Sequence, residues 1–132
     1  MAKTFVTVLG VFFIIAGIAG FIDPLSPDGE VLGLFFVGEP GTLHNLIHLL
    51  SGVAALAAVS SGEAAARMYA QVFGVVYALV TILGFIVGEG EILGLVPVNQ
   101  ADNVLHLAIA AGLLYFGFSG APAARTSGRA AA

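Results

Sequence analysis

Residues 4–22 read TFVTVLGVFFIIAGIAGFI, a run of 19 residues that contains no charge. About 20 apolar residues in a helix cross the hydrocarbon core of a bilayer, which is about 30 Å thick. The run therefore predicts a transmembrane helix. The apolar segment of a signal peptide is shorter, about 7–15 residues, so we expect this helix to be retained rather than cleaved.

Three more apolar segments follow the first one along the chain, at 43–59, 65–87 and 102–118. Polar residues are few in each of them. No part of the chain alternates between apolar and polar residues in the way that is typical of β-strands. We therefore predict an all-α integral membrane protein, in which residues 1–118 form one bundle of four transmembrane helices.

The composition excludes several classes of protein. Hydrophobic residues make up 59% of the chain and charged residues only 9%, and the mean hydropathy is +1.06. Soluble domains are about 25% charged and 45–50% apolar, so neither a soluble domain nor a disordered chain fits. Four basic residues are too few for the basic face of a nucleic-acid-binding protein. A chain without cysteine has no disulfide and no zinc–thiolate site.

The charged residues are sorted between the two sides of the predicted bundle. All four basic residues fall on one side: Lys3, Arg67, Arg125 and Arg129. Seven of the eight acidic residues fall on the other: Asp23, Asp28, Glu30, Glu39, Glu89, Glu91 and Asp102. Because cytoplasmic loops collect Lys and Arg, we predict that both termini are cytoplasmic (N-in, C-in). Residues 119–132, rich in Ala, Gly and Ser, are predicted to form a disordered cytoplasmic tail.

The two halves of the chain resemble each other, which predicts two tandem helical-hairpin repeats at 4–59 and 68–118. Two hairpins of the same orientation are related by a pseudo-twofold axis along the membrane normal. His48 then lies at the same depth as His106. The matching segments are Gly20-Phe-Ile22 with Gly84-Phe-Ile86, Gly29-Glu-Val-Leu-Gly-Leu34 with Gly90-Glu-Ile-Leu-Gly-Leu95, and Asn45-Leu-Ile-His48 with Asn103-Val-Leu-His106.

The segment Leu43-His-Asn-Leu-Ile-His-Leu-Leu-Ser-Gly52, with Asp102-Asn-Val-Leu-His106, resembles the signature of a family of small four-helix membrane proteins. This is domain-of-unknown-function family 4383, which is common in actinobacteria. The resemblance covers about residues 4–118, implies a four-helix fold and a multi-pass location in a bacterial cell membrane, and implies no activity. The chain departs from the family pattern at Gly38-Glu-Pro-Gly41, where the family usually has an Asn and a shorter polar turn.

Four polar residues are expected to form a cluster near the outer face of the bundle: Asn45, His48, Asn103 and His106. Polar groups inside a membrane are costly and are candidates for function. In the simplest interpretation the asparagines bond loop backbone, the histidines bond across the twofold axis or to loop carbonyls, and the cluster pins the outer loops. Thr42 or Asn99 is a candidate helix cap, and Asp102 has the position of the acid in a capping box after Asn99.

The histidines also allow a cofactor. His48 and His106, at equal depth, can serve as the two axial ligands of a haem b. A divalent metal can instead be held by His44, His48 and His106 together with loop carboxylates, because imidazole suits transition metals. The outer loops have no Lys or Arg to bind haem propionates, which counts against haem.

Transport and catalysis find less support in the sequence. An acidic outer mouth made by Glu30, Glu91 and Asp102 would attract cations, and a histidine can carry protons. However, the predicted helices have no break and no carboxylate at mid-depth. Ser51 lies three residues after His48, but without an orienting carboxylate the pair is not a triad.

The outer-loop motif is apolar for a segment outside the membrane. Its large residues are Leu32, Leu34, Phe35, Leu93 and Leu95. Because exposed apolar surface needs burial, we expect these residues either to dip into the membrane interface or to contact a partner protein.

From these patterns we expect a bacterial integral membrane protein that is not an enzyme, namely a structural or accessory protein or a subunit of a larger complex. The alternative is a haem- or metal-binding redox or sensor protein with His48 and His106 as ligands. A third hypothesis is a small component of cation or proton transport. The expected partners are the lipid bilayer and, in a homo-oligomer or larger membrane complex, further subunits.

Overall fold

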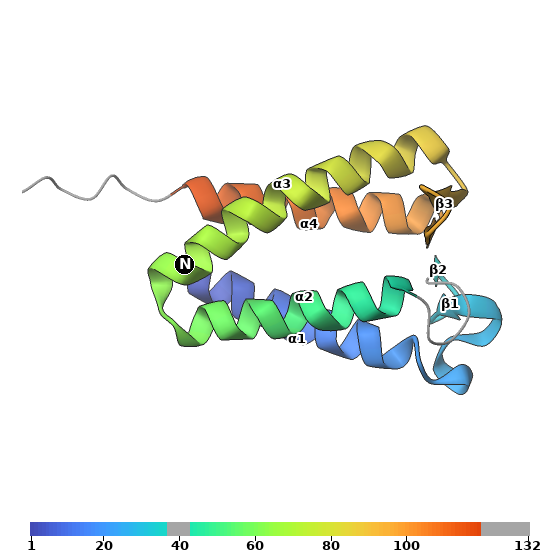
Figure 1. Ribbon diagram of the computed structural model, residues 1–132, viewed down its shortest axis with the longest axis horizontal. Coiled ribbons are helices and arrows are strands. Elements are labelled where there is room, and N and C mark those ends of the chain that lie inside the picture. The colour runs from blue at the N-terminus through green and yellow to red at the C-terminus, as the bar shows by residue number, and fades with distance from the viewer. Residues whose placement is uncertain (37–42, 120–132) are drawn as a thin grey trace, which may run out of the picture.

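The computed structural model describes residues 1–36 and 43–119, and four helices dominate it (Figure 1). Each helix is long and apolar enough to cross a membrane, which confirms the predicted four-helix bundle. Several predicted features lie outside the described residues: Glu39, Arg125, Arg129, the Gly38–Gly41 motif, the candidate cap Thr42 and the predicted tail from residue 120. The helices are α1 (Ala2–Ala19), α2 (Leu43–Ser60), α3 (Glu63–Val87) and α4 (Gln100–Phe118).

Helix α1 ends at Ala19, three residues before the predicted end at residue 22. A longer helix would need the N–H of residue 24 to bond the Gly20 carbonyl, but residue 24 is proline and has no N–H. The Asn45 side chain supplies the missing donor, with its Nδ2 atom 2.8 Å from the Gly20 oxygen. A proline and an asparagine distant in sequence therefore fix this boundary together.

Helix α4 begins at Gln100, two residues before the predicted start at residue 102. A capping box explains the start and confirms the predicted cap. The Asn99 Oδ1 atom accepts from the Asp102 N–H at 2.9 Å, and the Asp102 Oδ2 atom accepts from the Asn99 N–H at 3.0 Å. Helix α3 also begins two residues earlier than predicted, at Glu63, and α2 ends at Ser60, one residue later.

The helices pack mainly as two antiparallel pairs, α1 with α2 and α3 with α4 (Figure 1). Glycines permit close approach within the first pair. A Cβ atom on Gly52 would lie 2.7 Å from the Gly10 carbonyl oxygen, and one on Gly17 would lie 2.8 Å from the Leu49 backbone nitrogen. Real Cβ atoms do not approach backbone this closely, so these positions hold the two helices at backbone contact.

A small apolar core joins the two pairs. Phe13 and Leu113 are fully buried in it. Phe13 of α1 stacks on Tyr77 of α3, with ring centroids 5.3 Å apart. These two residues are equivalent under the predicted repeat, so the stack lies where a pseudo-twofold axis would pass between the pairs. The repeat bounds 4–59 and 68–118 remain a prediction from sequence.

The expectation of a chain without strands is wrong for the connections between paired helices. Strands β1 (Glu30–Val31) and β2 (Phe35–Phe36) form one antiparallel hairpin, and β3 (Gly90–Ile92) and β4 (Val96–Val98) form another. Strands of two or three residues are too short to show an alternating pattern. Two short 3₁₀ turns precede the first hairpin, at Asp23–Leu25 and Pro27–Gly29.

Both hairpins lie at the same end of the bundle, which we call the hairpin end (Figure 1). Each hairpin reaches the other half of the chain, because β2 contacts α4 and β4 contacts α2. The Asn99 Nδ2 atom also donates to the Leu34 carbonyl at 2.8 Å. The hairpins therefore tie the two helix pairs together where the histidines lie.

The opposite end of the bundle contains the start of α1 and the turn between α2 and α3. The N-terminal amine lies 3.3 Å from the Glu63 carboxylate there. Lys3 and Arg67 belong to the same end, whereas Glu30 and Glu91 are on the hairpins. In the described part of the chain, Lys3 and Arg67 are therefore at the end opposite to the hairpin acids, and Glu63 is the one acidic residue at their end.

Candidate metal centre

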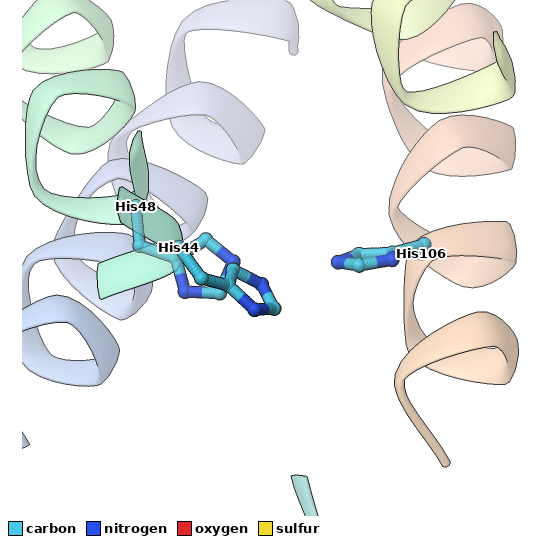
Figure 2. Close-up of side chains that lie close together, drawn as sticks. All are labelled: His44, His48 and His106. Atoms are coloured by element: carbon cyan, nitrogen blue, oxygen red, sulfur yellow. The ribbon is translucent and has the colours of Figure 1, made fainter. Parts of the chain in front are cut away.

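Three histidine side chains meet between the two helix pairs, just inside the hairpin end. His44 and His48 lie one turn apart on α2, and His106 faces them from α4 (Figure 2). The ring centroids are 4.6 Å apart for His44 and His48, 6.0 Å for His44 and His106, and 6.4 Å for His48 and His106. One nitrogen from each ring lies within 4.8 Å of the other two. We call these three residues the histidine cluster.

The histidine cluster is almost fully buried. The exposed fractions are 2% for His44, 7% for His48 and 2% for His106. His44 is in the first turn of α2, and its ring points inward to the cavity that it shares with His48, His106 and Val96 of β4. Burial in an apolar site favours neutral imidazoles, which is the form that binds metals.

Each ring of the cluster has an Nδ1 atom without a hydrogen-bond partner among the described residues. The His44 ring also lies beside the backbone of Pro97 in β4. A backbone carbonyl behind the ring is a common way to orient a metal-ligating histidine.

Aromatic rings support the cluster from the core side. Phe13 stacks on His48 with ring centroids 5.7 Å apart, and Tyr77 lies 5.6 Å from His106. These contacts make the floor of the site apolar, which strengthens any charge interaction inside it.

Two cavities flank the cluster and share His48. One, of about 160 Å³, lies between α2 and α3 and is lined by all three histidines, Ser51 and Tyr77. The other, of about 240 Å³, lies between α1 and α4 and is lined by His48 and Asp102. Asp102 occupies the position in the second half that His44 occupies in the first, so the two cavities are equivalents under the predicted repeat.

The expected acidic contribution to a metal site is not observed within ligand distance. In residues 1–36 and 43–119, the group that can hold a metal contains the three histidines and no carboxylate. Asp102 is 2% exposed and caps α4, whereas Glu30 and Glu91 extend from the hairpin strands. The three acids predicted for the outer face are therefore distributed over separate elements.

The structure divides the predicted four-residue polar cluster into two kinds of site. His48 and His106 face the other helix pair, but Asn45 and Asn103 turn back to the helix that precedes each in its own pair. Residues three apart on a helix differ in direction by about 60°, which is enough for His and Asn to point to different neighbours.

Both asparagines bond backbone carbonyls at the hairpin end of the preceding helix. Asn45 bonds Gly20, as described above, and the Asn103 Nδ2 atom donates to Gly84 at 3.0 Å and to Gly88 at 3.1 Å. Both side chains are fully buried. Their Oδ1 atoms contact the positions where Cβ atoms of Gly20 and Gly84 would be, so each Asn requires its Gly.

We expect Asn103→Ala to lower the free energy of unfolding by about 1–3 kcal/mol, because two carbonyls lose a buried donor. Thermal unfolding in detergent, followed by circular dichroism, measures this change. Ser60→Ala is the control, since it removes an exposed hydroxyl that bonds only the Ala57 carbonyl of the same helix. Equal stability of Asn103→Ala and Ser60→Ala would contradict the structural role of Asn103.

The fold and the site together define a small protein with four helices long and apolar enough to cross a membrane and a buried three-histidine group at one end. A family model described as Domain of unknown function (DUF4383) matches residues 3–119, and the chain belongs to that family. This match confirms the resemblance noted in the sequence. No curated protein and no protein of solved structure matches the chain.

Proposed function

We propose that this protein binds one transition-metal ion through His44, His48 and His106. The observation that carries the proposal is three buried imidazoles with nitrogens within 4.8 Å, each with an Nδ1 atom that bonds nothing among the described residues. A buried polar atom without a partner costs about 1–3 kcal/mol. A metal ion held between the three rings would give buried ring nitrogens a partner, whereas a purely structural cluster gives the Nδ1 atoms none among the described residues.

The distances fit a metal after a small rearrangement of the rings. Zinc–imidazole bonds of about 2.0–2.1 Å in a tetrahedral site place the nitrogens about 3.4 Å apart. The most distant pair therefore has to approach by about 1.4 Å, which rotation about the side-chain bonds provides. The 160 Å³ cavity beside the rings leaves room for this rotation and for a water molecule as fourth ligand.

The site geometry favours a metal ion over haem b. Pockets for drug-sized ligands measure about 300–1,000 Å³, and the cavity that touches all three histidines measures about 160 Å³. A porphyrin between His48 and His106 would also have to displace His44, whose ring lies 4.6 Å from that of His48.

The packing beneath the cluster favours a resident ion over a transported one. Phe13, Leu113 and Val6 are fully buried in the core on that side. A cation that entered from the hairpin end would meet a closed apolar layer below the histidines. We therefore infer a non-enzymatic metal-binding accessory or sensor protein.

Metal content tests the proposal on the parent protein. Detergent-purified protein, stripped with a chelator and dialysed against Zn²⁺, is expected to retain one ion per chain by elemental analysis. The Co²⁺-substituted protein is expected to show visible absorption bands of a four-coordinate site. Retention of far less than one Zn²⁺ per chain would overturn the proposal and return the cluster to the purely structural interpretation.

We further propose that the protein spans a bacterial cell membrane with its hairpin end outside. Lys3 and Arg67 at the opposite end support this orientation. Because the chain has no cysteine, Glu91→Cys and Ser61→Cys give single reporters at the two ends. We expect an impermeant maleimide to label Glu91→Cys on intact cells and to label Ser61→Cys only after permeabilisation. The reverse result would contradict the orientation.

A further inference from the structure

Both hairpin turns hold a leucine where the backbone favours another residue. Leu32 and Leu93 have φ values of 58° and 54°, and the glycines that follow them are also at positive φ. Two central residues at positive φ define a type I′ turn, which favours Asn-Gly or Asp-Gly. A leucine in this conformation is sterically strained. The same strained leucine conformation occurs in both halves of the chain, which indicates that the leucine side chains have a function.

The described part of the chain does not bury these leucine side chains. Leu32 is 79% exposed and Leu93 is 82% exposed. Leu34 and Leu95, on the other side of each turn, are also exposed. Val31 and Ile92 point inward and are buried.

The outer side of each hairpin therefore has one glutamate in its first strand, Glu30 or Glu91, and apolar residues at the turn. A hairpin with one side in water normally has polar residues on that side. The outward leucines predict an apolar environment around the turns. Glu30 and Glu91, at the start of the hairpins, are the nearest acidic residues along the chain.

The helix lengths place the hairpins at the edge of the bilayer. Helices α1 and α2 have 18 residues each and α4 has 19. At about 1.5 Å per residue they span about 27–29 Å, slightly less than the hydrocarbon core of about 30 Å. Helix α3, with 25 residues, spans about 37 Å and extends beyond the core. The hairpins thus begin at or just outside the ends of the acyl chains. Their edge backbone groups need water, so the hairpins belong in the headgroup region and not deeper.

We propose that the Leu32 and Leu93 turns insert into the boundary between headgroups and acyl chains of the lipid leaflet at the hairpin end. The two turns are equivalent under the repeat, so they act as a pair of apolar anchors. They hold the hairpins against the helix ends, above the histidine cluster. The partner of this surface is lipid, and the inference depends on the membrane-spanning helices but not on metal binding.

The absence of tryptophan from the chain makes a direct test available. Leu32→Trp and Leu93→Trp each introduce a single tryptophan, whose emission is measured in phosphatidylcholine nanodiscs with a scaffold protein that lacks tryptophan. We expect blue-shifted emission, strong quenching by lipids brominated near the headgroup, weaker quenching by lipids brominated near the chain end, and little quenching by iodide. Ser61→Trp, in the exposed turn between α2 and α3, is the control and should be quenched by iodide.

Two results would overturn the proposal. Strong iodide quenching without bromolipid quenching would place the turns in water. Protection from both quenchers, lost when the protein is diluted in excess lipid, would identify a second copy of the chain as the partner.

Nitroxide labels at Leu34→Cys and Leu95→Cys provide a second measurement beside the strained positions. We expect them to collide more with oxygen than with a water-soluble nickel chelate. The opposite preference would overturn the proposal even if the tryptophan variants fail to fold.

Discussion

His106→Ala is expected to lower the affinity of the protein for Zn²⁺ by more than about 100-fold, because changes even to residues behind a metal ligand cost about 10–100-fold. Within the described residues, His106 is the one member of the metal-capable group that comes from the second helix pair. Its loss leaves two ligands on α2, which cannot enclose an ion between the pairs. Competition with a zinc-sensitive dye measures the affinity.

Ligand-dependent stability provides a second measurement of the same effect. A metal that binds only the folded protein raises the unfolding temperature as its concentration rises. We expect Zn²⁺ to raise it for the parent and for Thr81→Ala, whose hydroxyl bonds only the Tyr77 carbonyl of the same helix. We expect no rise for His106→Ala or for the larger variant His106→Gln. An equal rise in the parent and both His106 variants would contradict the assigned ligands.

Gly52→Ala is expected to destabilise the protein by about 1–3 kcal/mol, the usual cost of adding a methyl group to a closely packed site. The new Cβ atom would lie 2.7 Å from the Gly10 oxygen and 2.9 Å from the Ile14 nitrogen. Both are backbone atoms, so α1 and α2 would have to separate. Larger residues at the same position are expected to prevent folding, since total stability is only about 5–15 kcal/mol.

Gly112→Ala is a matched control for Gly52→Ala. Gly112 is also in a helix, but the nearest obstacle to its Cβ atom is the end of the flexible Phe5 side chain, at 2.5 Å. Alanine favours a helix over glycine by about 1 kcal/mol, so this change is expected to be neutral or mildly stabilising. If both variants unfold in detergent at the same temperature as the parent, the assignment of backbone contact between α1 and α2 at Gly52 is wrong.

The four helices could be predicted because a long, uncharged, apolar run forms few structures other than a transmembrane helix. The hairpins could not, because strands of two or three residues leave no periodic signal. The motif Leu-Gly-Leu in both loops did contain a hint, since a glycine between short apolar runs is compatible with a tight turn. What concealed the turn was leucine in place of the usual Asn or Asp.

The candidate site was predicted in part. The repeat placed His48 and His106 at one depth, and the structure brings them together. It also brings in His44, whose ring lines the same cavity beside Ile92 and Val96 of the second hairpin. The pairing of Asn45 with Gly20 and of Asn103 with Gly84 was not predicted residue by residue. Such pairings depend on which helix face meets which neighbour, and that is a property of the packed bundle.

X-ray absorption spectroscopy of the zinc-loaded parent protein, at the zinc edge, is the most direct test of a three-histidine metal centre. We expect a first shell at about 2.0–2.1 Å that contains three imidazole nitrogens and one water oxygen, with the outer-shell scattering of histidine rings. His106→Ala should lose one of these rings from the spectrum. A first shell of oxygen atoms alone, without histidine scattering, would contradict a metal centre built from His44, His48 and His106.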